Sequence, residues 1–117
     1  MAKIETDITN SIAVELAPLG STLFKNVRGF FLSLDGKRKI TAGLQPNGSS
    51  DLIGLTKVLI TPDMVGQTIG VFTAIEVKTP TGAVRDNQAH FIKVILKYGG
   101  YAGIARNTED AKKIIKK

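Results

Sequence analysis

The stretch TIGVFTAIEVK, residues 68–78, carries the strongest strand signal in the chain, because β-branched and aromatic residues dominate it. Side chains alternate along a strand, so every second residue belongs to the same face. One face therefore holds Phe72, Ala74, Glu76 and Lys78. It changes from apolar to charged at its carboxyl end, which is typical either of a strand tip that leaves the core or of a functional site.

The segments on either side predict helices and strands in a mixed order. Isoleucines at four-residue spacing predict an amphipathic helix over residues 3–17, ended by Pro18 and Gly20. An apolar stripe followed by two glycines predicts a helix over residues 85–98, and Asn107 is placed to cap a last one. Strands are expected at residues 21–34, 38–45, 51–60, 68–78 and 101–106.

The predicted order is α-β-β-β-β-α-β-α, which places the chain in the α/β class. We expect one domain over residues 1–117, with a single mixed β-sheet flanked by helices. The late β-α-β unit is expected to pair its strands in parallel.

The composition excludes several classes of protein. With 43% hydrophobic and 22% charged residues, the chain is typical of a globular protein and not of a disordered tail. No apolar stretch reaches the ~18 residues of a membrane span, and the first ten residues lack the apolar core of a secretory leader. The chain has no cysteine, which removes disulfides, thiolate zinc sites and cysteine nucleophiles, and a cytoplasmic location is the default expectation.

The chain is basic, with a formal net charge of +6. Lysine and arginine release condensed counterions when they neutralise phosphates, so this excess favours a polyanionic partner. The lysines crowded at the C-terminus are also explained by solvation or by the helix dipole. Basic residues elsewhere are spread over several predicted elements, which better fits a binding face. The expected DNA contacts are Lys25, Arg28, Arg85 and Lys93.

Three further polar residues could join Glu76 and Lys78. Asp51 opens a β-type run, and a neighbouring strand would bring its carboxylate beside Glu76. Two close carboxylates repel, and a hard divalent cation such as Mg²⁺ relieves that repulsion. Gln88 falls on the sheet-facing side of its helix, where a half-exposed residue of the first turn is the structural alternative. Glu5 lies at the border of an apolar row, where helix-dipole complementarity is the structural alternative. Acids, an amide and a lysine around a metal are the set that suits phosphodiester hydrolysis.

Three segments, taken together, carry a family likeness. They are GSSDLIG at residues 48–54, FTAIEVKTPTG at 72–82 and DNQAHFIKVILKYGGYAGIAR at 86–106. In this order they resemble the virus-type replication-repair nuclease domain (VRR-NUC), a branch of the PD-(D/E)xK nuclease superfamily with a restriction-endonuclease-like core. The likeness covers about residues 5–115, and standalone domains of this length resemble those of phages and prophages, which act inside a bacterial host cell.

The resemblance implies a role for each residue of an ordered series. Asp51 and Glu76 would be metal ligands, with the Val77 backbone carbonyl completing the protein's share. Lys78 would orient the attacking water, favour its deprotonation and neutralise charge that builds on the phosphate. Gln88 would match the family glutamine near that lysine and the scissile phosphate.

The same resemblance places Glu5 at the glutamate of the family's N-terminal helix, which helps to hold a metal-bound water. Glu15 is the rival for that role and lies nearer to the helix end. Ser50 stands where the superfamily name implies a proline. That residue shapes the backbone and supplies no ligand, so the departure leaves the assignment of Asp51 in place.

Two other residues, Asp63 and His90, are further candidates for the site. Asp63 follows a proline and so fits the name of the superfamily motif better than Asp51 does. However, TPDMVG is typical of a connector with Thr61 as a helix cap. In such a connector Asp63 would bond local backbone amides or favour a helix dipole. His90 is the one histidine of the chain and falls on a different helix face from Gln88, so we expect a surface or DNA-proximal side chain.

The expected activity is that of an endonuclease that requires Mg²⁺ or Mn²⁺ and leaves a 3′-hydroxyl and a 5′-phosphate. The chain shows no helix-turn-helix or zinc finger, so we expect it to recognise DNA shape, with Holliday junctions as the preferred substrate of a homodimer. Two alternatives remain open: a flap or single-strand-directed nuclease, and a non-catalytic basic module that binds DNA or serves in assembly. Delivery of the DNA by a helicase or replication protein also stays open.

Overall fold

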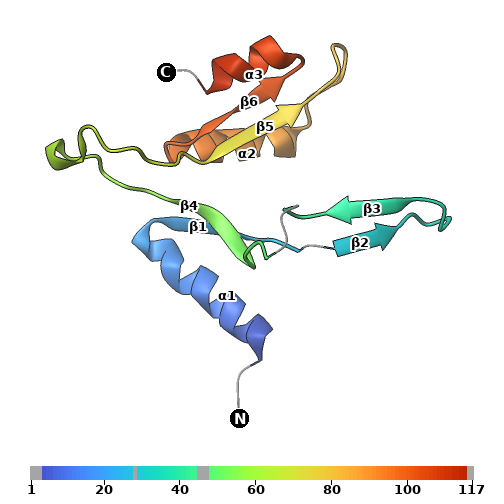
Figure 1. The fold of residues 1–117 in the computed structure, drawn as a ribbon, viewed down its shortest axis with the longest axis horizontal. Helices are drawn as coiled ribbons and strands as arrows, with labels where there is room; N and C mark the ends of the chain where they lie inside the picture. The colour runs from blue at the N-terminus through green and yellow to red at the C-terminus, as the bar shows by residue number, and fades with distance from the viewer. Residues whose placement is uncertain (1–3, 28, 45–47, 116–117) are drawn as a thin grey trace. The chain divides into compact units, whose positions relative to one another are not determined.

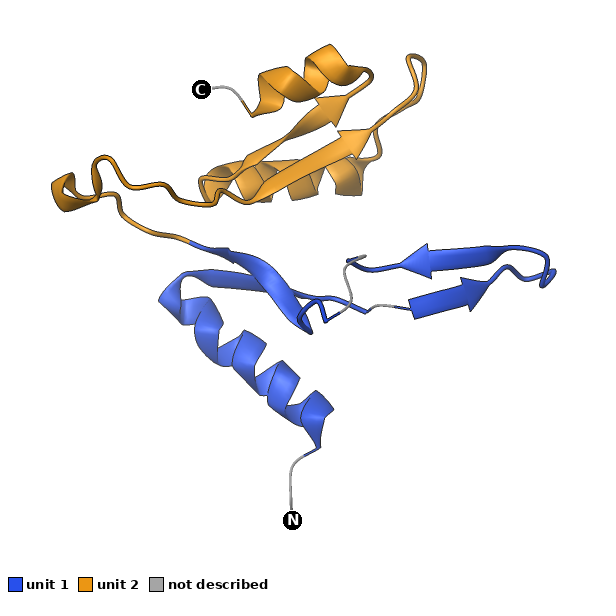
Figure 2. Cartoon of the chain, in the orientation of Figure 1, with its two compact units in different colours: residues 1–56 blue, residues 57–117 orange. Residues whose placement is uncertain are grey.

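A computed structural model describes residues 4–27, 29–44 and 48–115 of the chain. Its contacts divide the chain into two compact units, residues 1–56 and residues 57–117 (Figure 2). Each unit is a small α/β assembly and is described by itself. The predicted DNA contact Arg28 lies outside the described residues.

The described residues of unit 1 form one α-helix and two antiparallel strand pairs (Figure 1). The helix α1 spans Glu5–Leu16 and passes into a short 3-10 helix, η1, at Ala17–Leu19. Gly20 follows with a φ of 96°, a left-handed conformation that glycine adopts without steric cost, so the predicted end of the first helix is confirmed. The strands are β1 (Ser21–Lys25), β2 (Gly29–Leu32), β3 (Lys39–Ala42) and β4 (Leu52–Thr56).

The strand predicted over residues 21–34 is wrong as a single element, because the chain changes partner within it. β1 pairs with β4, whereas β2 forms the expected hairpin with β3. The break falls after Lys25, where Asn26 directs its hydrogen bonds to the segment before β4. This division adds one strand to the predicted order.

Unit 2 contains a parallel β-α-β arrangement followed by a last helix (Figure 1). Its elements are η2 (Pro62–Met64), β5 (Thr73–Val77), α2 (Asp86–Lys97), β6 (Tyr101–Ala105) and α3 (Thr108–Ile114). β5 and β6 pair in parallel, as predicted, and Asn107 caps α3 by accepting a 2.8 Å hydrogen bond from the Asp110 amide.

Tight packing where α2 meets β6 holds unit 2 together. Ile95 of α2 is fully buried and Ala105 of β6 is 4% exposed. A Cβ added to Gly100 would lie 2.7 Å from the Ile95 side chain and 2.9 Å from the Phe72 carbonyl oxygen. The glycine pair after α2 therefore ends the helix and also lets β6 start against the segment that leads into β5.

The mixed α/β class is confirmed, but the strands of the described residues form three two-stranded sheets and not the single sheet that we expected. The pairing expected between the Asp51 strand and the Glu76 strand is not among the ladders of these residues, in which β4 pairs with β1 and β5 with β6. Within the described ranges, none of the helices is both long and apolar enough to cross a membrane.

Candidate active site

The charged end of β5 forms a compact polar cluster. Gln88 Nε2 donates a 2.8 Å hydrogen bond to Glu76 Oε1, and Lys78 Nζ lies 3.8 Å from the same oxygen. The Lys78 side chain is 15% exposed and that of Glu76 is 34% exposed, so the two charges are partly withdrawn from water. The cluster therefore joins a carboxylate, an amide and an ammonium group on one face of unit 2.

Strand alternation explains how β5 presents this cluster. Ala74 and Glu76 are half-buried, whereas Thr73, Ile75 and Val77 are exposed. Glu76 thus shares the half-buried face of β5 with Ala74, as the predicted alternation requires, and its bond to Gln88 shows that this face meets α2. The charged end of this face therefore lies against α2 and not in open solvent.

The start of α2 fixes the amide of Gln88 from both ends. Its Oε1 accepts a 3.0 Å hydrogen bond from the Arg85 backbone amide, which would otherwise lack a partner at the helix start. Its Nε2 is then directed at Glu76. One side chain therefore completes the helix terminus and orients the carboxylate.

A hollow of about 330 Å³ lies beside this cluster, between β5 and α2. Its lining residues are Ala74, Ile75, Glu76, Asn87, Gln88, Phe91 and Ile92. The hollow combines an apolar wall with a carboxylate and amides, which is the usual make-up of a ligand-binding hollow.

The donor set of unit 2 is compatible with a hard divalent cation. Both contacts of Glu76 involve Oε1, and Oε2 has no hydrogen-bond or ion-pair partner in the part of the chain that the structure describes. Carboxylate and carbonyl oxygens are the protein ligands that Mg²⁺ prefers, and Val77, which follows Glu76, supplies such a carbonyl. Across residues 4–27, 29–44 and 48–115, no three acidic, histidine or cysteine side chains gather into a metal site on their own.

Asp51 belongs to unit 1, where Asn26 anchors the backbone around it. The Asn26 amide N–H donates to the Asp51 carbonyl at 2.8 Å, and Nδ2 donates to both Ser49 Oγ and the Ser50 carbonyl at 2.9 Å. Its Oδ1 accepts from the Leu44 amide at 2.9 Å. The Asp51 residue itself is exposed, so its backbone is held in place while its side chain faces solvent.

The sequence analysis missed Asn26. A signal was present, because asparagine is depleted in strands and stood within a run that was predicted as one strand. The residue both divides that run and organises the approach to Asp51.

A second hollow, of about 450 Å³, lies in unit 1 and brings three of the predicted residues together. Glu5, Lys25 and Asp51 line it, with Thr6, Thr9, Asn26 and Val27. Glu15 is exposed and is not among these lining residues. Of the two helix glutamates, Glu5 therefore shares a hollow with Asp51.

Asp63 has a local partner, in keeping with a connector. It lies in η2, exposed, and accepts a hydrogen bond from the Thr61 hydroxyl. This bond holds the pKa of the Asp63 carboxyl below its usual value, with a smaller contribution from the backbone. Thr61 stands at the predicted N-cap position of η2 but makes no side-chain cap, because its hydroxyl donates to Asp63.

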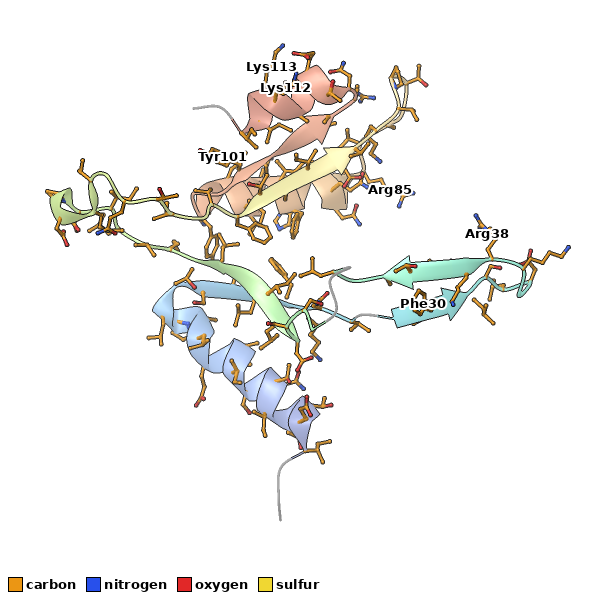
Figure 3. All side chains as sticks on the ribbon, in the orientation of Figure 1. Phe30, Arg38, Arg85, Tyr101, Lys112 and Lys113 are labelled. Carbon is orange, nitrogen blue, oxygen red and sulfur yellow. The ribbon has the colours of Figure 1, made fainter. Side chains whose placement is uncertain are left out.

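The predicted DNA-contact residues that the structure describes are all exposed. Lys25 ends β1, Arg85 precedes α2 (Figure 3), and Lys93 lies on α2. His90 is also exposed on α2, as expected. Exposure is the condition for contact with phosphates, and each of these residues meets it.

Comparison with known families decides what kind of protein carries this geometry. A family model described as the VRR-NUC domain matches residues 41–109, more than half of the chain. This chain belongs to the VRR-NUC family. It is therefore a nuclease of the virus-type replication-repair class, with DNA as its substrate. No curated protein and no solved structure matches it. The VRR-NUC match contains Asp51, Glu76, Lys78 and Gln88, and Glu5 precedes it.

Proposed function

We propose that this VRR-NUC protein is a metal-dependent endonuclease that cuts branched DNA at the cluster formed by Glu76, Lys78 and Gln88. The observation that carries the proposal is the convergence of Gln88 Nε2 and Lys78 Nζ on one oxygen of Glu76, at 2.8 Å and 3.8 Å. A carboxylate held in this way at the end of a strand is suited to bind a cation and to keep a fixed orientation.

The residues of unit 2 divide the chemical work. Gln88 holds Glu76 Oε1, which leaves Oε2 to face a cation. Lys78 keeps an ammonium group beside the carboxylate, where it stabilises negative charge on the phosphate and favours a deprotonated attacking water. A bound Mg²⁺ or Mn²⁺ would supply Lewis acidity and charge neutralisation.

Asp51 is proposed as the second carboxylate for the same cation, with the Val77 carbonyl as a further oxygen and Glu5 as the residue that orients water. The support for Asp51 is its place within the VRR-NUC match and the hydrogen bonds of Asn26 around it. The support for Glu5 is the hollow that it shares with Asp51.

Both units are proposed to serve one nuclease domain, as the sequence predicts. The VRR-NUC match runs from residue 41 to residue 109 and so crosses the boundary between the units after Thr56. A family model that spans both units favours a shared function for them.

Branched DNA is the proposed substrate because the chain has basic contacts and no base-reading motif. Lys25, Arg85 and Lys93 are exposed, and phosphates and DNA shape are recognised through such groups without base contacts. A homodimer would present two cleavage sites to the opposed strands of a four-way junction.

The proposal is tested with labelled four-way junction, flap, duplex and single-stranded DNA, each incubated with Mg²⁺, Mn²⁺ or EDTA. We expect cutting of the junction with either metal and none with EDTA. Preferred cutting of the flap or single strand would replace the junction as substrate. Binding without metal-dependent cutting of any of these molecules would favour the non-catalytic alternative and overturn the proposal.

A further inference from the structure

The loop that joins Lys78 to the helix of Gln88 is bound by an arginine from outside the predicted site. Arg106 follows β6, and its Nη1 donates to the Thr79 carbonyl at 2.6 Å and to the Gly82 carbonyl at 2.8 Å. The Gly82 amide closes the turn by donating to the Thr79 carbonyl at 3.1 Å. A single guanidinium nitrogen therefore joins both ends of the Thr79–Gly82 turn.

Arg106 is itself held in place. Its amide donates to Asp110 Oδ2 at 2.9 Å, and the residue is half-buried. The preceding residue, Ala105, is buried and accepts a 3.0 Å hydrogen bond from the Lys78 amide. Consecutive residues at the end of β6 thus hold the Lys78 backbone and the turn that follows it.

The turn leads directly into the other side of the cluster. After Ala83 and Val84, the Arg85 backbone amide donates a hydrogen bond to Gln88 Oε1, and Gln88 Nε2 donates to Glu76. Movement of the turn would shift Lys78 at one end and the Gln88 helix start at the other. Hydrogen bonds from a charged guanidinium to two carbonyls are stronger than neutral ones, so they resist this movement.

We propose that Arg106 is a positioning residue of the nuclease, which acts through the Thr79–Gly82 turn to keep Lys78 and Gln88 in register with Glu76. The proposal rests on the proposed function of that cluster. Misplacement of reacting groups by about 1 Å costs on the order of 100-fold in rate, so loss of Arg106 should lower kcat by about 10- to 100-fold while KM for DNA stays within a few-fold.

The test compares Arg106→Ala, Arg106→Lys and Lys112→Ala, each of which is checked for cooperative thermal unfolding. Lys112 is the matched control, because Lys112→Ala removes the same charge from exposed α3 (Figure 3), where the side chain contacts Glu109 and not the turn. We expect wild-type kcat for Lys112→Ala and a low kcat for Arg106→Ala that millimolar guanidinium chloride raises. We expect an intermediate kcat for Arg106→Lys, whose ammonium can donate to both carbonyls but sits on a shorter side chain than Nη1.

A direct phosphate contact by Arg106 gives a different result, and it would overturn the proposal. KM would then rise while kcat would stay unchanged in Arg106→Ala, and Arg106→Lys would restore KM. Unchanged kinetics in Arg106→Ala would overturn it as well.

A second measurement does not depend on cleavage. Removal of Arg106 should shift the NMR resonances of the Gln88 side-chain amide and speed hydrogen exchange at the Gly82 amide, with Lys112→Ala unchanged. If the wild-type protein cuts none of the DNA molecules, the proposed function fails, and these signals still decide whether Arg106 positions the cluster. Signals in Arg106→Ala that match the wild type would overturn the positioning role.

Discussion

Single side chains with more than one partner define the candidate site at the scale of residues. The Gln88 side chain bonds both the helix start and Glu76, and the Asn26 side chain bonds Ser49 Oγ, the Ser50 carbonyl and the Leu44 amide. Side chains that are hydrogen-bonded through both their N–H and their carbonyl ends have few alternative positions. Such residues fix the orientation of the groups that they bond.

The choice between Asp51 and Asp63 as the catalytic aspartate is tested by substitutions that neutralise single charged side chains. Asp51→Asn and Glu76→Gln should abolish cutting of a four-way junction, and Lys78→Ala should do the same through loss of its ammonium group. Asp63→Asn should keep activity within a few-fold, because its partner is the Thr61 hydroxyl of η2. Cleavage rates and junction binding, followed by fluorescence anisotropy, are measured for each variant.

The first three variants should still bind the junction, which separates lost chemistry from lost folding. An inactive Asp63→Asn variant beside an active Asp51→Asn variant would reverse the assignment of the two aspartates.

The anchoring role of Asn26 gives a graded prediction. Asn26→Ala removes three side-chain hydrogen bonds, each worth roughly 1 kcal/mol before water replaces part of them, and should lower kcat by about 10-fold through the Asp51 backbone. Asn10→Ala, on the exposed side of α1, is the matched control and should behave as the wild type. Equal rates for the two variants would show that Asp51 needs no support from Asn26.

At the scale of elements, the sequence predicted correctly those features of helices and strands that depend on neighbouring residues in the chain. The alternation of β5, the glycine stop of α2 and the Asn107 cap were all predicted correctly, since each depends on neighbours in the chain. The run at residues 21–34 was wrong, because its division depends on a partner strand that lies 27 residues away at the point where Lys25 pairs with Leu52. Periodicity carries no information about such a partner.

In the candidate site, too, contacts that local patterns imply were predictable and contacts between distant residues were not. The bond from Gln88 to Glu76 was predictable as proximity, because an apolar helix face had to meet a strand face. Arg106 was missed, since its two carbonyl partners lie 24 and 27 residues earlier in the chain and backbone acceptors leave no mark on a sequence.

The β1–β4 pair gives a test of element packing. A Cβ on Gly54 would lie 1.9 Å from the Thr22 carbonyl oxygen, so Gly54→Ala should force the strands apart and lower the free energy of unfolding by about 1–3 kcal/mol. Gly70→Ala is the control, because nothing lies within 4 Å of its added Cβ. Urea unfolding measures both, and a Gly54→Ala variant as stable as the wild type would contradict the close pairing of β1 with β4.

At the scale of the whole molecule, a net charge of +6 dominates the expected encounter with DNA. Basic side chains are exposed on both units, among them Arg38 on the β2–β3 hairpin and Arg85 before α2 (Figure 3). Binding that releases counterions weakens steeply as salt rises, whatever the sequence of the DNA.

Salt titrations therefore test the predicted contacts. Lys25→Ala, Arg85→Ala and Lys93→Ala should each weaken junction binding and reduce the slope of log K against log salt by about 1. Lys112→Ala, which removes a charge from α3, should leave the slope unchanged. A wild-type slope in all three contact variants would remove these residues from the DNA interface.

The proposed sharing of one cation by Glu76 and Asp51 is tested most directly by calorimetric titration of Mn²⁺ into the protein. We predict one site in the wild type and in Asp63→Asn, with loss of at least 10-fold in affinity in both Glu76→Gln and Asp51→Asn, since each removes a charged oxygen ligand. Wild-type Mn²⁺ affinity in Glu76→Gln and Asp51→Asn would contradict the claim.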